Sequence, residues 1–143
     1  MGEWCQGKRQ GHGIALTASG SRYEGAWKAD VPHGQGKKIF QSGSCYEGGF
    51  NEGKRHGKGT FNFADGSVYI GEWVDEKRTG LGMCELYNGD KYFGQWLDDH
   101  MTGLGMYTKA NGVKHLGYFQ NGKFEGEGIQ VRDNTDIVRG KWI

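Results

Sequence analysis

The segment Gly48-x-x-x-x-Gly53-Lys54 is the first candidate for a chemical function. This spacing opens the glycine-rich loop that cradles phosphates in nucleotide hydrolases. That loop also needs a Ser or Thr after the lysine, to hold Mg²⁺, and a helix whose N-terminus meets the phosphates. Arg55 stands at the hydroxyl position, and strands are expected downstream. We therefore interpret the segment as a strand connection that requires glycine, and we predict no nucleotide site.

The same incomplete motif recurs at residues 2–9 and 117–124, which are separated from the first by multiples of 23 residues. The chain also has six G-x-G pairs, but none of them has the further glycine of G-x-G-x-x-G that a dinucleotide site needs. The glycines are thus expected to serve backbone geometry.

Histidines are the next candidates for metal or general-base chemistry. They are His12, His33, His56, His100 and His115. His33 and His56 are 23 residues apart, at equivalent positions of neighbouring repeats, and two strand spacings place them about 10 Å apart, too far to share one metal ion. Loop histidines that bind backbone groups are the favoured interpretation. A zinc ion held between loops or between chains by a cysteine and a histidine stays an open alternative.

No residue group suggests catalysis. A nucleophile motif such as G-x-S-x-G is absent from the sequence, and acidic residues such as Glu24 and Glu47 recur every 23 residues instead of forming one singular pair. We predict that the chain is not an enzyme and that it needs no cofactor and no metal.

Composition narrows the class of protein. The 143 residues suit one domain, and their net charge of +1 argues against whole-surface attraction to nucleic acid. Three cysteines, Cys5, Cys45 and Cys84, form no C-x-x-C pair and are interpreted as reduced thiols. With no apolar run of about 20 residues and no signal peptide, we expect a soluble cytoplasmic protein, associated with the cytoskeleton or with a membrane.

Glycine reveals the organisation of the chain, because it is close to one residue in five and recurs with a fixed period. One glycine series has a step of 23 residues: Gly2, Gly25, Gly48, Gly71, Gly94, Gly117 and Gly140. Two positions later an aromatic series keeps the same step: Trp4, Trp27, Phe50, Trp73, Trp96, Phe119 and Trp142. The chain is therefore a repeat without insertions.

Each repeat is expected to form a β-hairpin. Tyr46, Gly48 and Phe50 alternate with polar or small residues, as in a strand with one buried face. Residues 60–63 form a second β-prone segment, which the turn dipeptide Asp65-Gly66 closes. Because a lone hairpin is marginally stable, the units should stack and bury one another's apolar faces. We predict an all-β fold, an elongated and twisted single array of stacked antiparallel β-hairpins.

The array is expected to fill residues 1–143 as a single domain. Its predicted units are a partial repeat 1–22, the repeats 23–45, 46–68, 69–91, 92–114 and 115–137, and a partial repeat 138–143.

The segments YEGAWKADVPHGQG, YEGGFNEGKRHGKGTFNFADGS and YIGEWVDEKRTGLG resemble the MORN repeat (membrane occupation and recognition nexus), whose pattern is Y-E-G-x-W-x-x-G-x-x-H-G-x-G. The resemblance covers the whole chain. His115 and Val138 depart from the leading Tyr, and Thr135 departs from the turn Gly. These departures suggest an end unit, a cap or a self-association surface.

The resemblance implies a non-enzymatic scaffold or interaction module, since proteins with such repeats include cytoskeletal scaffolds, axoneme components, membrane-tethering proteins and accessory regions of lipid kinases. In the cytoskeletal group, C-terminal repeats dimerise, which implies homodimerisation through residues 115–143 here. The candidate self-association residues are His115, Phe119, Phe124, Ile129, Val131, Val138 and Trp142.

Protein partners are expected along an aromatic groove, because rings in equivalent positions form rows along the array. The candidate groove residues are Tyr23, Trp27, Tyr46, Phe50, Phe61, Phe63, Tyr69, Trp73, Tyr92 and Trp96.

The alternative function is a peripheral membrane module that binds anionic phospholipids such as phosphoinositides. Its candidate residues form a basic row: Lys8, Arg9, Lys37, Lys38, Lys54, Arg55, Lys77, Arg78 and Lys123. Acidic residues such as Asp98 and Asp99 lie in the equivalent connections of later repeats, so a solvated charged edge stays the competing interpretation.

Overall fold

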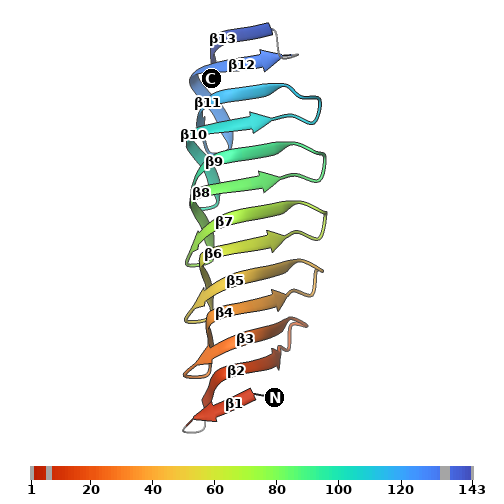
Figure 1. Ribbon diagram of the computed structural model, residues 1–143, viewed down its shortest axis with the longest axis vertical. Helices are drawn as coiled ribbons and strands as arrows, with labels where there is room; N and C mark the ends of the chain where they lie inside the picture. The colour runs from red at the N-terminus through yellow and green to blue at the C-terminus, as the bar shows by residue number, and fades with distance from the viewer. Residues whose placement is uncertain (1, 6–7, 133–135, 143) are drawn as a thin grey trace.

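The computed structural model describes residues 2–5, 8–132 and 136–142, and the regular elements of these ranges are all β-strands. Thirteen strands form one antiparallel sheet in which each strand pairs with its neighbours in sequence, from β1 to β13 (Figure 1). No helix that could cross a membrane occurs in the described ranges. The predicted all-β array of stacked hairpins is confirmed.

The strands have these bounds: β1 (Gly2–Cys5), β2 (Lys8–Leu16), β3 (Arg22–Lys28), β4 (Val31–Ile39), β5 (Cys45–Asn51), β6 (Lys54–Asn62), β7 (Val68–Val74), β8 (Lys77–Glu85), β9 (Lys91–Leu97), β10 (His100–Thr108), β11 (Lys114–Gln120), β12 (Lys123–Arg132) and β13 (Asp136–Trp142).

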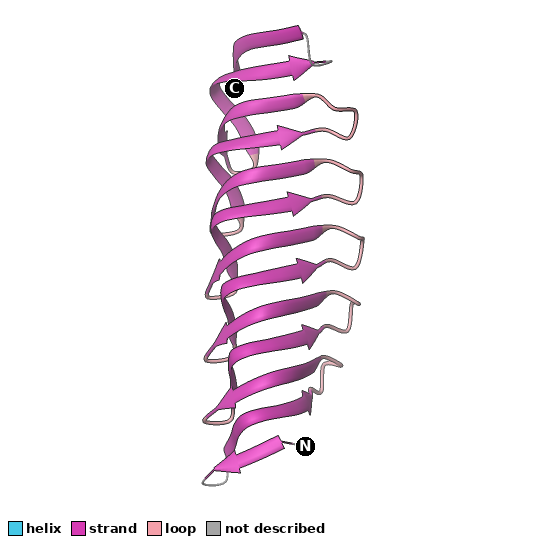
Figure 2. Cartoon of the chain, viewed as in Figure 1, coloured by secondary structure: helices cyan, strands magenta, loops and turns pink. Residues whose placement is uncertain are grey.

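Two kinds of connection alternate along the sheet (Figure 2). A narrow two-residue turn joins the two strands of a repeat, and both of its residues have positive φ, as at Glu52 (49°) and Gly53 (84°). Positive φ at both positions matches the right-handed twist of hairpin strands. A wider turn leads to the next repeat and closes where the Phe63 N–H donates to the Ser67 carbonyl (2.8 Å), around Gly66 at φ 98°. This is the turn that Asp65-Gly66 predicts.

The second strand of each repeat is longer than expected. The sequence places a strand at residues 60–63, whereas β6 runs from Lys54 to Asn62. The polar stretch before it pairs with β5, with a register shift between Gly48 and Phe50. The added length follows from hydrogen bonding, because backbone groups of polar segments pair as readily as those of apolar ones once a two-residue turn aligns them.

The core lies on one face of the sheet, where tyrosine rings lie against bare glycine. Gly48 and Gly59 face each other across β5 and β6, and a Cβ atom added at Gly59 would collide with the ring of Tyr46. The Tyr46 hydroxyl donates to the Gly49 carbonyl (2.9 Å). The buried core residues are Tyr23, Trp27, Tyr46, Phe50, Phe61, Tyr69, Trp73, Cys84, Tyr92, Trp96 and Phe119. Glycine thus leaves space on one face of the sheet, and the aromatic side chains pack there against the backbone.

Candidate interaction surface

The face that bears the aromatic rings, here called the aromatic face, is largely filled by those rings. Nine of the ten candidate groove residues are at most 8% exposed, and Phe63 is partly buried. Their rings contact edge to face, as Tyr46 does with Phe50 (5.2 Å between centroids) and Trp73 (5.4 Å). Because the described part of the chain forms one sheet without a second layer over it, the rings must cover one another. The structure therefore places these rings in the core, and this face keeps hollows of about 450, 320 and 190 Å³ between them.

The tyrosine hydroxyls of the aromatic face are structural donors. Burial raises the pKa of Tyr23, Tyr46, Tyr69 and Tyr92 to about 12. Each stays protonated and donates to the carbonyl three residues later, with oxygen-to-oxygen distances of 2.7, 2.9, 3.0 and 3.0 Å.

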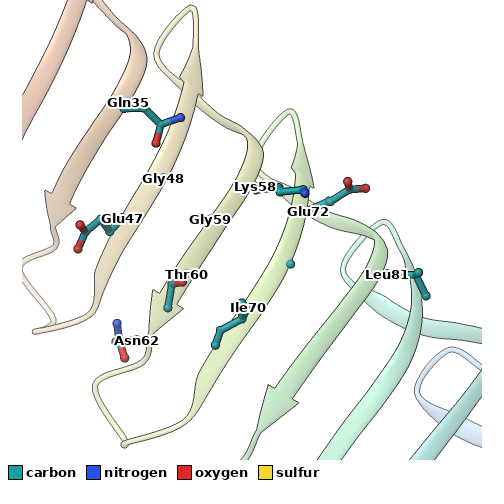
Figure 3. Close-up of a pocket in the computed structure, with 11 residues that line it drawn as sticks. Gln35, Glu47, Gly48, Lys58, Gly59, Thr60, Asn62, Ile70, Glu72 and Leu81 are labelled. Atoms are coloured by element: carbon teal, nitrogen blue, oxygen red, sulfur yellow. The ribbon is translucent and has the colours of Figure 1, made fainter.

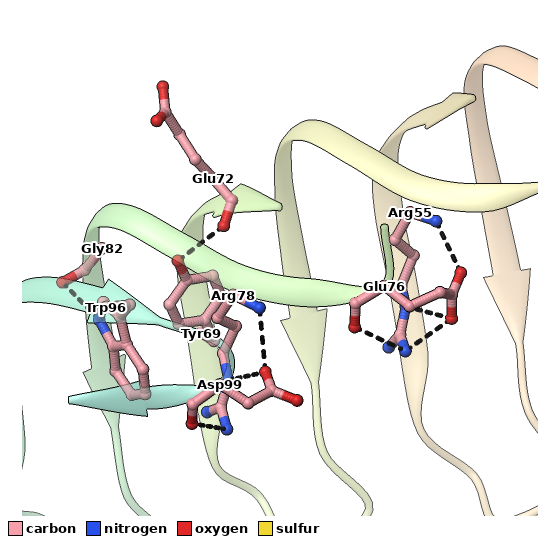
Figure 4. A network of polar contacts seen from close by, with 8 residues as sticks. All are labelled: Arg55, Tyr69, Glu72, Glu76, Arg78, Gly82, Trp96 and Asp99. Carbon is pink, nitrogen blue, oxygen red and sulfur yellow. Dashed lines mark hydrogen bonds and ion pairs between the residues drawn. The ribbon is translucent and has the colours of Figure 1, made fainter. Parts of the chain in front are cut away.

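Arg55 and Arg78 lie over the aromatic face instead of on an exposed row (Figure 4). The Arg55 guanidinium lies 4.7 Å from the Trp73 ring centroid and pairs with Glu76 (Nη2 to Oε2, 2.8 Å). The backbone N–H of Arg55 donates to the same carboxylate (2.7 Å). Only 17% of the Arg55 side chain is exposed. The two groups come from neighbouring repeats, so the contact fastens one hairpin to the next.

Arg78 repeats this arrangement one unit later. Its guanidinium lies 4.5 Å from the Trp96 ring centroid and pairs with Asp99 (Nε to Oδ1, 2.8 Å). Burial would raise the pKa of Asp99, but hydrogen bonds and charge from Arg78 outweigh burial and lower that pKa. Both arginines are thus engaged within the chain.

The lysines of the basic row do not share one surface of the molecule. Lys54, Lys77 and Lys123 are exposed and follow narrow turns, whereas His100 follows the turn between those of Lys77 and Lys123. Lys37 is exposed on the opposite face, and the Lys38 ammonium lies 5.0 Å from the Phe40 ring centroid. The side chains of Lys8 and Arg9 lie outside the described residues. Of the proposed row, the three turn lysines remain exposed at equivalent positions, in a series that His100 interrupts.

The candidate self-association residues differ in burial, and some of them lie outside the described residues. His115 and Phe119 are buried, and Phe124 packs against the core. Burial, with a smaller contribution from Lys109, lowers the pKa of His115. Ile129 and Val131 are half-buried. The side chains of Val138 and Trp142, and Thr135 as a whole, lie outside the described residues.

Histidine and cysteine form no metal cluster within the described ranges. The expected loop position is wrong, because all five histidines lie in strands. The expected backbone contact is present at His33, whose Nδ1 accepts a hydrogen bond from the Glu52 N–H (3.4 Å). Cys45 and Cys84 are free thiols, and burial raises the pKa of Cys84. A zinc ion held between chains stays the open alternative to the predicted absence of a metal.

The face opposite the aromatic face carries an exposed row that the sequence interpretation missed. We call it the outer ladder, and it consists of Ile70, Met83, Phe93, Met106, Leu116 and Ile129. Each member pairs with the next across adjacent strands from β7 to β12. The first five are 37% to 54% exposed, and Ile129 is half-buried.

Further apolar side chains stand beside the outer ladder, with bare backbone between the two rows. They are Leu81, Leu104 and Tyr118, each more than half exposed. A shallow trough of about 830 Å³ extends from Gln35 on β4 to Leu81 on β8, and its lining is mostly polar until Ile70 and Leu81 at its C-terminal end (Figure 3). Another, of about 750 Å³, is lined by Leu104, Leu116 and Ile129. The C-terminal half of this face therefore offers a ridged apolar surface.

A periodic signal could have revealed the outer ladder. The residue directly after each leading Tyr or His is Glu24, Glu47, Ile70, Phe93 and Leu116 in turn. The same row continues through Lys37 and Thr60 in the N-terminal half. The switch from polar to apolar residues within one position of the repeat marks where the exposed apolar surface begins.

Comparisons with known proteins agree with the repeat organisation. The family model described as MORN repeat matches residues 1–22, 23–45, 46–68, 69–91, 92–114 and 115–136. Among solved structures, the SAS-4 (dCPAP) TCP domain of Drosophila melanogaster, in complex with a proline-rich motif of Ana2 (dSTIL), is similar at 12% identity and a TM-score of 0.43. The alignment covers 92% of this chain and 85% of that one, and at this score it carries no inference about partners. A search of curated proteins gave no match.

Proposed function

Because the chain belongs to the MORN-repeat family, we propose that it is a non-enzymatic interaction module whose outer ladder binds protein partners. Membership indicates a protein-interaction or membrane-associated repeat module. The remaining question is which surface a partner would use. The rings of the aromatic face are buried and two arginines lie over them, whereas the exposed apolar side chains of the outer ladder lie on the opposite face.

The observation that carries this proposal is the continuity of the outer ladder. Six apolar residues follow one another on six adjacent strands, which at about 4.8 Å per strand gives a row roughly 24 Å long. Soluble monomers rarely expose extended apolar patches unless these are functional. Covering the row would remove apolar side chains from water, at roughly 25 cal/mol per Å² of buried surface.

The self-association expected for the C-terminal repeats fits the same surface. Leu116 and Ile129 extend the outer ladder into those repeats, whereas His115, Phe119 and Phe124 are committed to the core. We place the module in the cytoplasm, at a cytoskeletal or membrane-associated partner, and imaging of a fluorescently tagged chain would check this placement.

Site-specific photo-crosslinking in cells tests the proposed surface. A benzophenone side chain at position 93 should give crosslinked adducts with protein. The same side chain at position 37 lies on the same face and the same row, but in the polar half, and should give few. Equal yields at the two positions would contradict the proposal.

A membrane-associated function is the second candidate, and the exposed turn lysines favour it. Lys54, Lys77 and Lys123 occupy equivalent positions beside narrow turns, and each lysine near an anionic surface contributes about 1 kcal/mol. Vesicles containing phosphoinositide should co-sediment the chain at low salt, and the variant Lys54→Glu/Lys77→Glu/Lys123→Glu should lose that binding. Lys58→Glu, an exposed lysine away from the turns, is the matched control. Absent co-sedimentation, or equal loss with the control, would exclude this candidate.

A further inference from the structure

The outer ladder has a midpoint that makes it self-complementary. Its six residues lie one per strand from β7 to β12, so the midpoint falls between Phe93 and Met106. Resting on the proposed function, we propose that the ladder's partner is a second copy of this chain, packed face to face about a two-fold axis at that midpoint.

The two-fold axis fixes which residues meet. An axis parallel to the strands reverses the strand order in the second copy and keeps each residue's position along its strand. Phe93 then meets the partner's Met106. In the same way Met83 meets the partner's Leu116, and Ile70 meets the partner's Ile129. Every apolar member of the ladder gains an apolar neighbour.

Neighbouring registers fit less well. An axis moved half a strand spacing toward the N-terminus sets Ile129 against the partner's Thr60. A shift the other way sets Ile70 against the partner's Arg139, because Arg139 continues the row after Ile129. Of these three registers, only the central one pairs all six apolar residues with apolar residues, and we therefore propose that register.

Charges beside the ladder support the same register. On the side of the wide turns, the flanking row contains Glu85 on β8 and Lys114 on β11, both exposed and both equally far from the midpoint. Glu85 therefore meets the partner's Lys114, and symmetry makes this contact twice. Val68 and Val131, the next residues outward along that row, also meet.

The opposite flank carries both a favourable and an unfavourable contact. Leu81 meets the partner's Tyr118, which extends the apolar contact. Glu72 meets the partner's Glu127 near the rim, where like charges weaken association. Packed sheets cross at about −30°, so contacts near the axis are kept best. A strip of this width lies at the small end of protein interfaces, and the dimer should be reversible.

Sedimentation equilibrium of the purified full chain over a concentration series tests the proposal. The wild-type chain should follow a monomer–dimer equilibrium. Lys114→Glu should weaken the dimer about tenfold, because two attractive pairs become repulsive. Glu85→Lys/Lys114→Glu should restore the dimer by swapping the charges. Glu127→Lys should strengthen it severalfold, and Lys37→Glu, in the polar half, should leave it unchanged.

Several results would overturn this dimer. A chain that stays monomeric at every concentration would do so, and adducts from position 93 with another protein would then leave the proposed function standing. A dimer that Lys114→Glu does not weaken, or that the charge swap does not restore, would overturn the register. Circular dichroism of each variant would show that the sheet is intact, since all four substitutions lie at exposed positions.

Discussion

At the scale of single residues, glycine and tyrosine act as one unit in each repeat. The Tyr46 ring occupies the space that a side chain at Gly59 would need, and its hydroxyl donates to Gly49. The same geometry recurs around Tyr23, Tyr69 and Tyr92. The regular spacing of the glycines therefore marks the positions at which a tyrosine ring lies against the backbone.

Gly59→Ala should destabilise the chain by about 1–3 kcal/mol, because the new methyl group would overpack the core against Tyr46. Urea unfolding would measure the change in the free energy of unfolding. Lys58→Ala, one residue away on the exposed face, should change it by less than about 0.5 kcal/mol. An equally small effect at Gly59 would show that the ring can move aside.

His115 gives the C-terminal repeats a dependence on pH. Burial, with help from Lys109, lowers the pKa of His115 below its usual value of about 6.5. The unfolded chain then binds a proton where the folded chain does not, so stability is full above pH 6.5 and is lost as pH falls toward the folded pKa. His115→Phe should reduce the slope of stability between pH 7 and 5, measured by urea unfolding. An unchanged slope would mean that protonation of His115 is not the cause of the pH dependence of stability.

At the scale of elements, the narrow turns do two things at once. Asp99 has a φ of 72°, which disfavours residues other than glycine, yet its carboxylate holds Arg78 of the preceding repeat. One repeat later, Met101 and Gly122 occupy the equivalent positions. Gly122 adopts the same backbone region without a carboxylate. The junction between repeats is thus formed in two ways, by an ion pair at Arg78 and Asp99 and without one at Met101 and Gly122.

Arg78→Met should destabilise the chain by about 1–3 kcal/mol, since Asp99 would lose its partner while remaining partly covered. Arg78→Met/Asp99→Gly reproduces the Met101 and Gly122 junction and should cost less than the sum of the single variants. A double-mutant cycle by thermal unfolding would measure the coupling. Additive effects would argue that the ion pair contributes nothing.

At the scale of the whole molecule, each hairpin contacts only its neighbours, so the sheet is quasi-one-dimensional. Its aromatic face is nearly uniform from Tyr23 to Trp96, whereas its opposite face changes from polar to apolar at Ile70. Stability is therefore spread along the array, and the candidate binding surface is confined to one half.

Removing residues 115–143 should leave residues 1–114 folded, because the contacts of the earlier repeats do not depend on distant ones. The backbone amide NMR signals of residues 22–62, which precede the outer ladder, should keep their positions. The shorter chain should unfold at a lower temperature, because the pairing of β10 with β11 is lost. Global unfolding of residues 1–114 would contradict this local view of stability.

The sequence by itself determined the fold, since a period of 23 residues and the alternation in segments such as Tyr46 to Phe50 dictate hairpins, repeat boundaries and the buried side of each strand. The function of individual side chains depended on contacts between repeats. Arg55 and Glu76 are 21 residues apart and become a pair only through the register of β6 against β7. Likewise, the rings close over one another because the sheet has one layer, and this leaves the outer ladder as the open apolar face. Periodicity within a strand specifies which side a residue faces, but only the packing of neighbouring strands decides which side is covered.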